Sequence, residues 1–129
     1  MNIKKIMQEV HSNALEKGFW EDKETKNVGE LLMLCVSELG EALDAHRENK
    51  FANTEQFKQI MHGYTFADSP ITFQETFKRD IKDSFEDEIA DTVIRLFDLS
   101  EGLGIDLEFH IRQKTDYNKT RPFKHNKAY

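Results

Sequence analysis

Apolar residues recur at helical spacing along nearly the whole chain, and this pattern constrains the fold more than any other feature. Between residues 28 and 47 the apolar positions return every three or four residues, at Val28, Leu31, Leu32, Cys35, Leu39, Ala42 and Leu43. That spacing places them on one face of an α-helix. The two-residue alternation of a half-buried strand does not stand out anywhere, and no internal repeat is visible. We therefore predict an all-α fold, an antiparallel helical bundle.

Capping residues and helix breakers divide the chain into helices and connections. The predicted helices cover residues 3–17, 28–47, 54–61, 73–101 and 105–118, and the fourth is the longest. Gly18 is the expected C-cap of the first helix and Thr54 the N-cap of the third. Gly102 and Gly104 are expected to end the fourth helix, and Pro122 prevents a simple continuation of the last. The remainder of residues 48–76 is expected to be a packed connection between core helices.

The chain has 129 residues, the usual size of one domain, and we predict a single domain over residues 1–129. Apolar residues make up 38% and charged residues 33%, so the apolar share is low for a globular protein. Ten phenylalanines still supply ring area for a core. This balance is typical of long helices, or of a core that a partner chain completes.

Nothing in the sequence indicates a membrane or an oxidising compartment. Cys35 is the single cysteine, so it cannot form an internal disulfide. The longest apolar run covers residues 31–36, which is far too short to span a bilayer, and no signal peptide is visible. We predict a cytoplasmic protein that does not associate with membranes.

The net charge of −6 is distributed unevenly. Residues 110–129 contain six lysines and arginines and one acid, Asp116, for a net charge of +5. The acidic body suits cations and the basic tail, residues 117–129, suits anions. A solvated terminus is the ordinary interpretation of such a tail.

Two pairs of carboxylates border the apolar stripes. Glu38 and Glu41 are three residues apart, as are Glu88 and Asp91, so each helix can direct two carboxylates to one place. Acids so close to a core are costly unless bases, protons or a metal neutralise them. Helices are rich in glutamate, so the spacing alone also arises by chance. The chain contains no Glu-x-x-His of the di-iron type and no partner for Cys35, which leaves oxygen ligation of Mg2+ or Mn2+.

Four separated segments also resemble one protein family. Residues 37–43 (SELGEAL) and 86–96 (EDEIADTVIRL) are similar to the E-E-x-x-E and E-x-x-D elements of the MazG-like, all-α nucleoside triphosphate pyrophosphohydrolases. Residues 14–20 and 117–125 resemble the entry segment and the tail of a subgroup of that family. Two departures stand out: Ser37 replaces the first Glu of the motif, and 46 residues separate Glu41 from Glu88.

The resemblance implies magnesium-dependent hydrolysis between the α and β phosphates of a (d)NTP, in house-cleaning or control of the nucleotide pool. Glu38, Glu41, Glu88 and Asp91 would hold the metal, with Glu38 also acting as the general base. Lys119, Arg121 and Lys127 would contact phosphate oxygens, Trp20 would stack on the base, and Asn118 would bind the base or sugar. The resemblance also implies a homodimer or homotetramer. Independently of it, long helices in a short chain leave apolar faces that one chain cannot fully cover.

Two other functions remain open on sequence alone. A non-enzymatic helical module would use the basic tail to bind nucleic acid or a partner protein, with strong salt dependence and no need for metal. The acidic body and the inward carboxylates argue against it, and no nucleic acid partner is expected. A purely structural helical oligomer would not be stabilised by magnesium and nucleotide.

Overall fold

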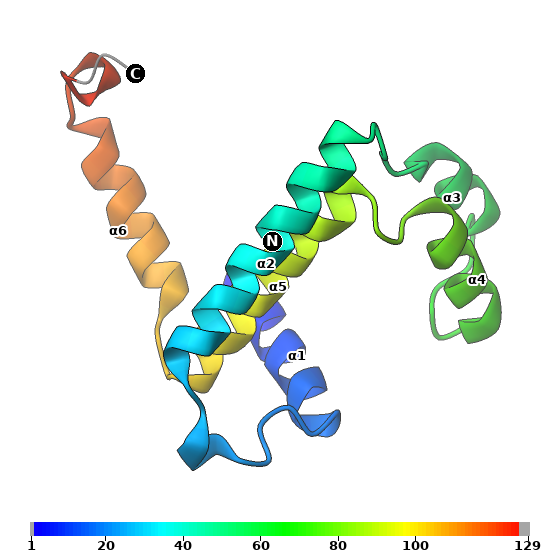
Figure 1. Ribbon diagram of the computed structural model, residues 1–129, viewed down its shortest axis with the longest axis horizontal. Coiled ribbons are helices and arrows are strands. Elements are labelled where there is room, and N and C mark those ends of the chain that lie inside the picture. The colour runs from blue at the N-terminus through cyan, green and yellow to red at the C-terminus, as the bar shows by residue number, and fades with distance from the viewer. Residues whose placement is uncertain (1, 127–129) are drawn as a thin grey trace. The chain divides into compact units, whose positions relative to one another are not determined.

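The computed structural model describes residues 2–126, and all regular secondary structure in that range is helical (Figure 1). The α-helices are α1 (Ile3–Glu16), α2 (Val28–Arg47), α3 (Thr54–Ile60), α4 (Pro70–Asp80), α5 (Phe85–Gly102) and α6 (Leu107–Lys119), with 3-10 helices η1 (Lys23–Thr25) and η2 (Phe123–Asn126). The predicted all-α class is confirmed. In the described range, no helix has the length and apolar character that crossing a membrane requires.

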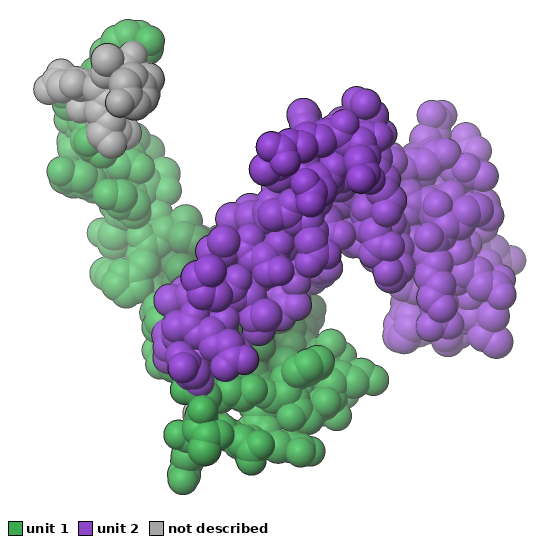
Figure 2. All heavy atoms as spheres, viewed as in Figure 1, with its two compact units in different colours: residues 1–26, 97–129 green, residues 27–96 purple. Residues whose placement is uncertain are grey.

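The chain divides into two compact units, coloured separately in Figure 2. Unit 1 takes the described residues of 1–26 and 97–129, and unit 2 takes residues 27–96. Helix α5 therefore begins in unit 2 and ends in unit 1. All four predicted metal ligands belong to unit 2, and the four predicted substrate residues that the structure describes belong to unit 1.

Helices α2 and α5 lie side by side and antiparallel in unit 2 (Figure 1). His46, near the end of α2, packs edge-on against Phe85 at the start of α5, with ring centroids 5.2 Å apart. Two turns earlier on α2, Glu38 bonds to Arg95, which lies further along α5. The side chain of Asn27 caps α2 by accepting a hydrogen bond from a backbone N–H of its first turn, and α2 has the predicted bounds.

The buried row of α2 shares only Cys35 and Ala42 with the apolar stripe that the sequence predicted. The buried residues are Cys35, Glu38, Ala42 and Ala45. Leu32, Leu39 and Leu43 are about half exposed, as is Val36. Small side chains allow two helices to pack closely, so the row of small residues faces inward and the larger leucines occupy the adjacent face.

The predicted helix over residues 73–101 is wrong, because the structure contains two helices with a break at residues 81–84. Asp83 adopts a left-handed conformation (φ 58°), which an α-helix cannot include. Ser84 then begins α5, accepting a hydrogen bond at Oγ from the backbone N–H of Asp87 (3.3 Å). The longest helix is instead α2, with 20 residues.

Helices α3 and α4 form an excursion between α2 and α5. Two backbone hydrogen bonds close its base: Asn53 N–H donates to the Asp80 carbonyl (2.7 Å), and Phe85 N–H donates to the Lys50 carbonyl (2.8 Å). Within it, Phe57, Phe66, Phe73 and Phe77 form an aromatic cluster. The expected N-cap Thr54 is the first helical residue, and the cap is Asn53, whose side chain accepts from Gln56 N–H (3.1 Å). Helix α4 occupies part of what the sequence suggested was a connection.

In unit 1, the single tryptophan is held against the end of α5. The indole N–H of Trp20 donates to the Asp98 carboxylate (2.9 and 3.0 Å), which His11 Nδ1 also meets at 2.7 Å. Gly102 lies directly against the ring of Trp20. The C-cap of α1 is Lys17, one residue before the predicted Gly18, and Gly18 (φ 81°) follows it in a left-handed conformation that favours glycine.

Candidate metal centre

Helix α5 presents one row of functional side chains toward α2. Glu88, Asp91 and Arg95 follow one another at intervals of three and four residues, so they share a face. Thr92 lies beside them, buried, and its hydroxyl donates to the Glu88 carbonyl (3.0 Å). From α2, Glu38 projects from the buried row that also contains Cys35 and Ala42. The small neighbours on α2 leave room for this carboxylate between the helices.

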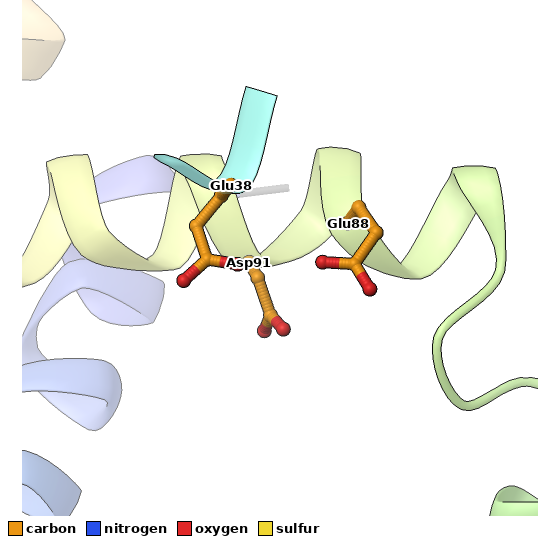
Figure 3. Close-up of side chains that lie close together, drawn as sticks. All are labelled: Glu38, Glu88 and Asp91. Carbon is orange, nitrogen blue, oxygen red and sulfur yellow. The ribbon is translucent and has the colours of Figure 1, made fainter. Parts of the chain in front are cut away.

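Three of the four predicted metal ligands converge on one place. Carboxylate oxygens of Glu38, Glu88 and Asp91 all lie within 4.8 Å of one another. Figure 3 shows Glu38 reaching the group from α2, and Glu88 and Asp91 reaching it from successive turns of α5. Glu38 is only 8% exposed and Glu88 only 6%, while Asp91 is half-buried. These three residues are called the carboxylate cluster below.

Glu41 lies at the edge of the carboxylate cluster and not inside it. Its side chain is exposed, and it is not one of the three residues whose oxygens meet within 4.8 Å. Its charge nevertheless acts on the cluster, because Glu41 raises the pKa values of both Glu88 and Asp91. Glu41 can therefore be a ligand only if its side chain turns toward the cluster.

The cluster carries negative charge that the protein does not fully balance. Burial is the main cause that raises the pKa of Glu88, followed by the charges of Glu41, Glu38 and Asp91. Burial likewise raises the pKa of Asp91, with Asp87 and Glu38 adding to it and Arg95 opposing it. A raised pKa means that the ionised form of each carboxylate is disfavoured, and a bound cation would stabilise that form.

Arg95 is the residue of this site that sequence reasoning missed. Its Nε donates to Glu38 Oε1 at 2.6 Å, and its Nη2 lies 2.6 Å from the same oxygen. The available signal was its position on α5, seven residues after Glu88 and four after Asp91, which places a base on the carboxylate face. Arg95 balances Glu38, while the side chain of Glu88 has no hydrogen bond or ion pair among the described residues.

The residues present suit a hard divalent cation. All three members of the cluster offer oxygen, and Glu88 is a buried residue whose carboxylate keeps some contact with solvent and has no hydrogen-bond or ion-pair partner in the described range. Mg2+ and Mn2+ prefer such ligands, whereas zinc and copper sites are dominated by His and Cys. The group of side chains that could bind a metal within the described range contains neither His nor Cys.

The pKa shifts predict a pH dependence of stability in the metal-free protein. An acid whose pKa is raised by folding costs stability as pH rises from its ordinary pKa, 4.5 for Glu and 3.8 for Asp, through the folded value. We expect the contribution of Glu88 and Asp91 to be absent at low pH and fully destabilising at neutral pH. Chemical denaturation of the natural chain and of a Glu88→Gln/Asp91→Asn variant between pH 4 and pH 7 gives the two free energies of unfolding. Their difference at each pH is the contribution of these two carboxylates. An unchanged difference between the two proteins across this range would contradict the prediction.

Four of the five predicted substrate residues lie in the described part of unit 1, and none of these four belongs to the carboxylate cluster. Trp20 is 6% exposed, so a base could stack on its ring only after the side chain or its cover moves. Lys119, at the end of α6, is exposed and paired with Asp116 (2.6 Å). Asn118 is exposed beside it, and Arg121 is half-buried just beyond the helix. Lys127 lies outside the described residues, and all five substrate contacts remain predictions.

Comparisons with known proteins do not assign the chain to a family. No protein-family model, curated protein or solved structure matches it. The functional proposal therefore depends on the chemistry of the carboxylate cluster together with the motif resemblance described above.

Proposed function

We propose that the protein is a magnesium-dependent nucleoside triphosphate pyrophosphohydrolase, which converts a (d)NTP to a nucleoside monophosphate and pyrophosphate. The observation that carries the proposal is the convergence of Glu38, Glu88 and Asp91 within 4.8 Å, with Glu88 buried and unpartnered. The reaction class is what the resemblance of the segments that contain these residues to the pyrophosphohydrolase motifs implies. House-cleaning, or control of the nucleotide pool, is the corresponding role.

The residues divide into metal ligands, a base and substrate contacts. Glu38, Glu88 and Asp91 would hold the cation, with Glu41 joining them from the edge of the cluster. Bound magnesium, or manganese in its place, would neutralise the triphosphate and polarise the phosphorus under attack. Glu38 would take a proton from the attacking water, whose oxygen bonds to the α-phosphorus while the bond from that phosphorus to the bridging oxygen breaks and pyrophosphate leaves. Trp20, Asn118, Lys119, Arg121 and Lys127 would hold the base, sugar and phosphates.

The test is a pyrophosphate-release screen over standard and modified (d)NTPs, with and without magnesium. At least one nucleotide should yield pyrophosphate and the monophosphate only when the metal is present. Release of inorganic phosphate instead, or turnover that is unaffected by a chelator, would contradict the proposed reaction.

A second copy of the chain is the proposed partner, because α2 and α5 leave apolar rows uncovered. Leu32, Val36, Leu39 and Leu43 follow one another on α2, and Ile89, Val93 and Leu96 do so on α5; all are exposed. On both helices, residues of the apolar row directly follow in the sequence residues of the contact face, which is the face toward the other helix. The row is therefore rotated by about a quarter turn from the contact face on each helix. Because the helices are antiparallel, both rows fall on the same side of the pair. A homodimer, or a tetramer built from two dimers, would bury them.

Leu39→Glu is expected to convert the oligomer to a monomer, since it places a charge in the middle of the apolar row. Size-exclusion chromatography with light scattering should show the natural chain at twice its 15.1 kDa or more, and the variant at the single-chain mass. Ser37→Glu adds the same charge at an exposed position of α2 outside the row and should leave the mass unchanged. A monomeric natural chain would contradict this prediction.

A further inference from the structure

Arg95 holds Glu38 through one carboxylate oxygen. Both the Nε and Nη2 atoms of Arg95 lie 2.6 Å from Glu38 Oε1. The Glu38 side chain is 10% exposed, and that of Arg95 is 43% exposed. The carboxylate is thus held inside the helix pair, while part of the guanidinium group reaches solvent.

Arg95 differs from the other ion-paired lysines and arginines of unit 2 in the acid that it binds. Arg47, Arg79 and Lys82 form ion pairs with Asp44, Asp80 and Asp83, none of which belongs to the carboxylate cluster. Arg95 instead pairs with a member of that cluster and lies one turn beyond another member, Asp91, on the same helix. A phosphate bound beside the cluster would come within reach of its side chain.

A cation at the cluster would compete with Arg95 for Glu38. A carboxylate that ligates a divalent ion has less charge to offer an arginine, so the ion pair weakens as the metal binds. The guanidinium group is then left beside the metal without its acid. Its planar set of N–H donors matches phosphate oxygens, which makes a triphosphate the natural replacement partner.

We propose that Arg95 is a phosphate-binding residue that magnesium releases from Glu38. In the metal-free protein Arg95 forms an ion pair with Glu38. With metal bound, Arg95 turns from Glu38 to a phosphate oxygen of the substrate. This inference rests on the proposed function, since it assumes that the cluster binds magnesium and that a polyphosphate is the ligand. It makes binding of metal and binding of polyphosphate mutually reinforcing.

The test measures two affinities separately by calorimetry: that for magnesium alone, and that for inorganic tripolyphosphate in excess magnesium. Arg95→Gln should bind magnesium at least as tightly as the natural chain, because it removes the group that competes with the cation for Glu38. Its tripolyphosphate affinity should fall by about tenfold or more, the usual scale for losing a charge-assisted hydrogen bond. Arg95→Lys keeps the charge without the planar donors and should give an intermediate loss. Arg47→Gln, which removes an exposed arginine paired with Asp44, should change neither affinity.

The outcomes separate the inference from the function beneath it. A contrary outcome is that both variants bind magnesium more weakly, with a tripolyphosphate affinity that falls only by the same factor. In that case Arg95 merely positions Glu38, and the inference is overturned. The same holds if both variants bind tripolyphosphate as the natural chain does. If the natural chain fails to bind magnesium, the proposed function is overturned as well. Circular dichroism of the variants establishes that they are folded before the affinities are compared.

Discussion

Glu88→Gln is expected to abolish magnesium-dependent pyrophosphate release and, at the same time, to raise the melting temperature of the metal-free protein. Glu88 is buried without a partner, and Glu38, Glu41 and Asp91 surround it with like charge. Glutamine keeps the shape but removes the charge, which relieves repulsion in the absence of metal. It also removes a ligand, and a loss of turnover of at least about a hundredfold is the expected scale, since even outer partners of metal ligands cost 10- to 100-fold.

The two expected effects have opposite signs, since turnover falls while the melting temperature of the metal-free protein rises. A purely structural glutamate would lower stability when replaced, and turnover would follow only through the folded fraction. Glu30→Gln, at an exposed position in the first turn of α2, is the matched control and should change turnover little. Magnesium should raise the melting temperature of the natural chain and of Glu30→Gln, but not that of Glu88→Gln. Retention of full turnover in Glu88→Gln would overturn the proposed site.

Gly102→Ala is expected to destabilise the protein strongly for so small a change. A Cβ at this position would lie 2.2, 2.5 and 2.8 Å from three atoms of the Trp20 ring. The ring is rigid, and its N–H is bonded to Asp98, so it cannot move aside without giving up that hydrogen bond. Overpacking of this kind costs about 1–3 kcal/mol.

Gly40→Ala is the matched control, because Gly40 is also a helical glycine but has nothing within 4 Å of an added Cβ. Alanine there should stabilise the protein by up to about 1 kcal/mol through helix propensity. Denaturation followed by far-UV circular dichroism gives the free energy of unfolding, and the fluorescence of the single tryptophan reports whether the ring has moved. Equal stability of Gly102→Ala and the natural chain, with unchanged fluorescence, would contradict the packing of Trp20 on Gly102.

Much of the local structure was predictable because it depends on neighbours along the chain. The spacing of apolar residues predicted α2 with its observed bounds, and the glycines predicted where α1 and α5 end. Carboxylates three residues apart on a helix share a face whatever lies opposite them. The two pairs therefore indicated a metal site, and Glu38, Glu88 and Asp91 do converge.

The features that sequence reasoning got wrong or missed depend on contacts between distant segments. The break at residues 81–84 occurs where the base of the α3–α4 excursion is closed by hydrogen bonds to Lys50 and Asn53, and no local pattern reveals such a closure. Burial of Trp20 depends on the absence of a side chain at Gly102, far along the chain.

By itself, the sequence determined the all-α class, the face that each carboxylate shares with its neighbours, and the oxygen-only character of the candidate metal site. Only the tertiary structure decided which of those faces meet. It brought Arg95 to Glu38, left Glu41 at the edge of the cluster, and turned the small residues of α2 inward so that the leucines remained exposed. The physical reason is that helical periodicity reports which side chains share one face of a helix, whereas the partner of that face depends on how closely two helices can pack.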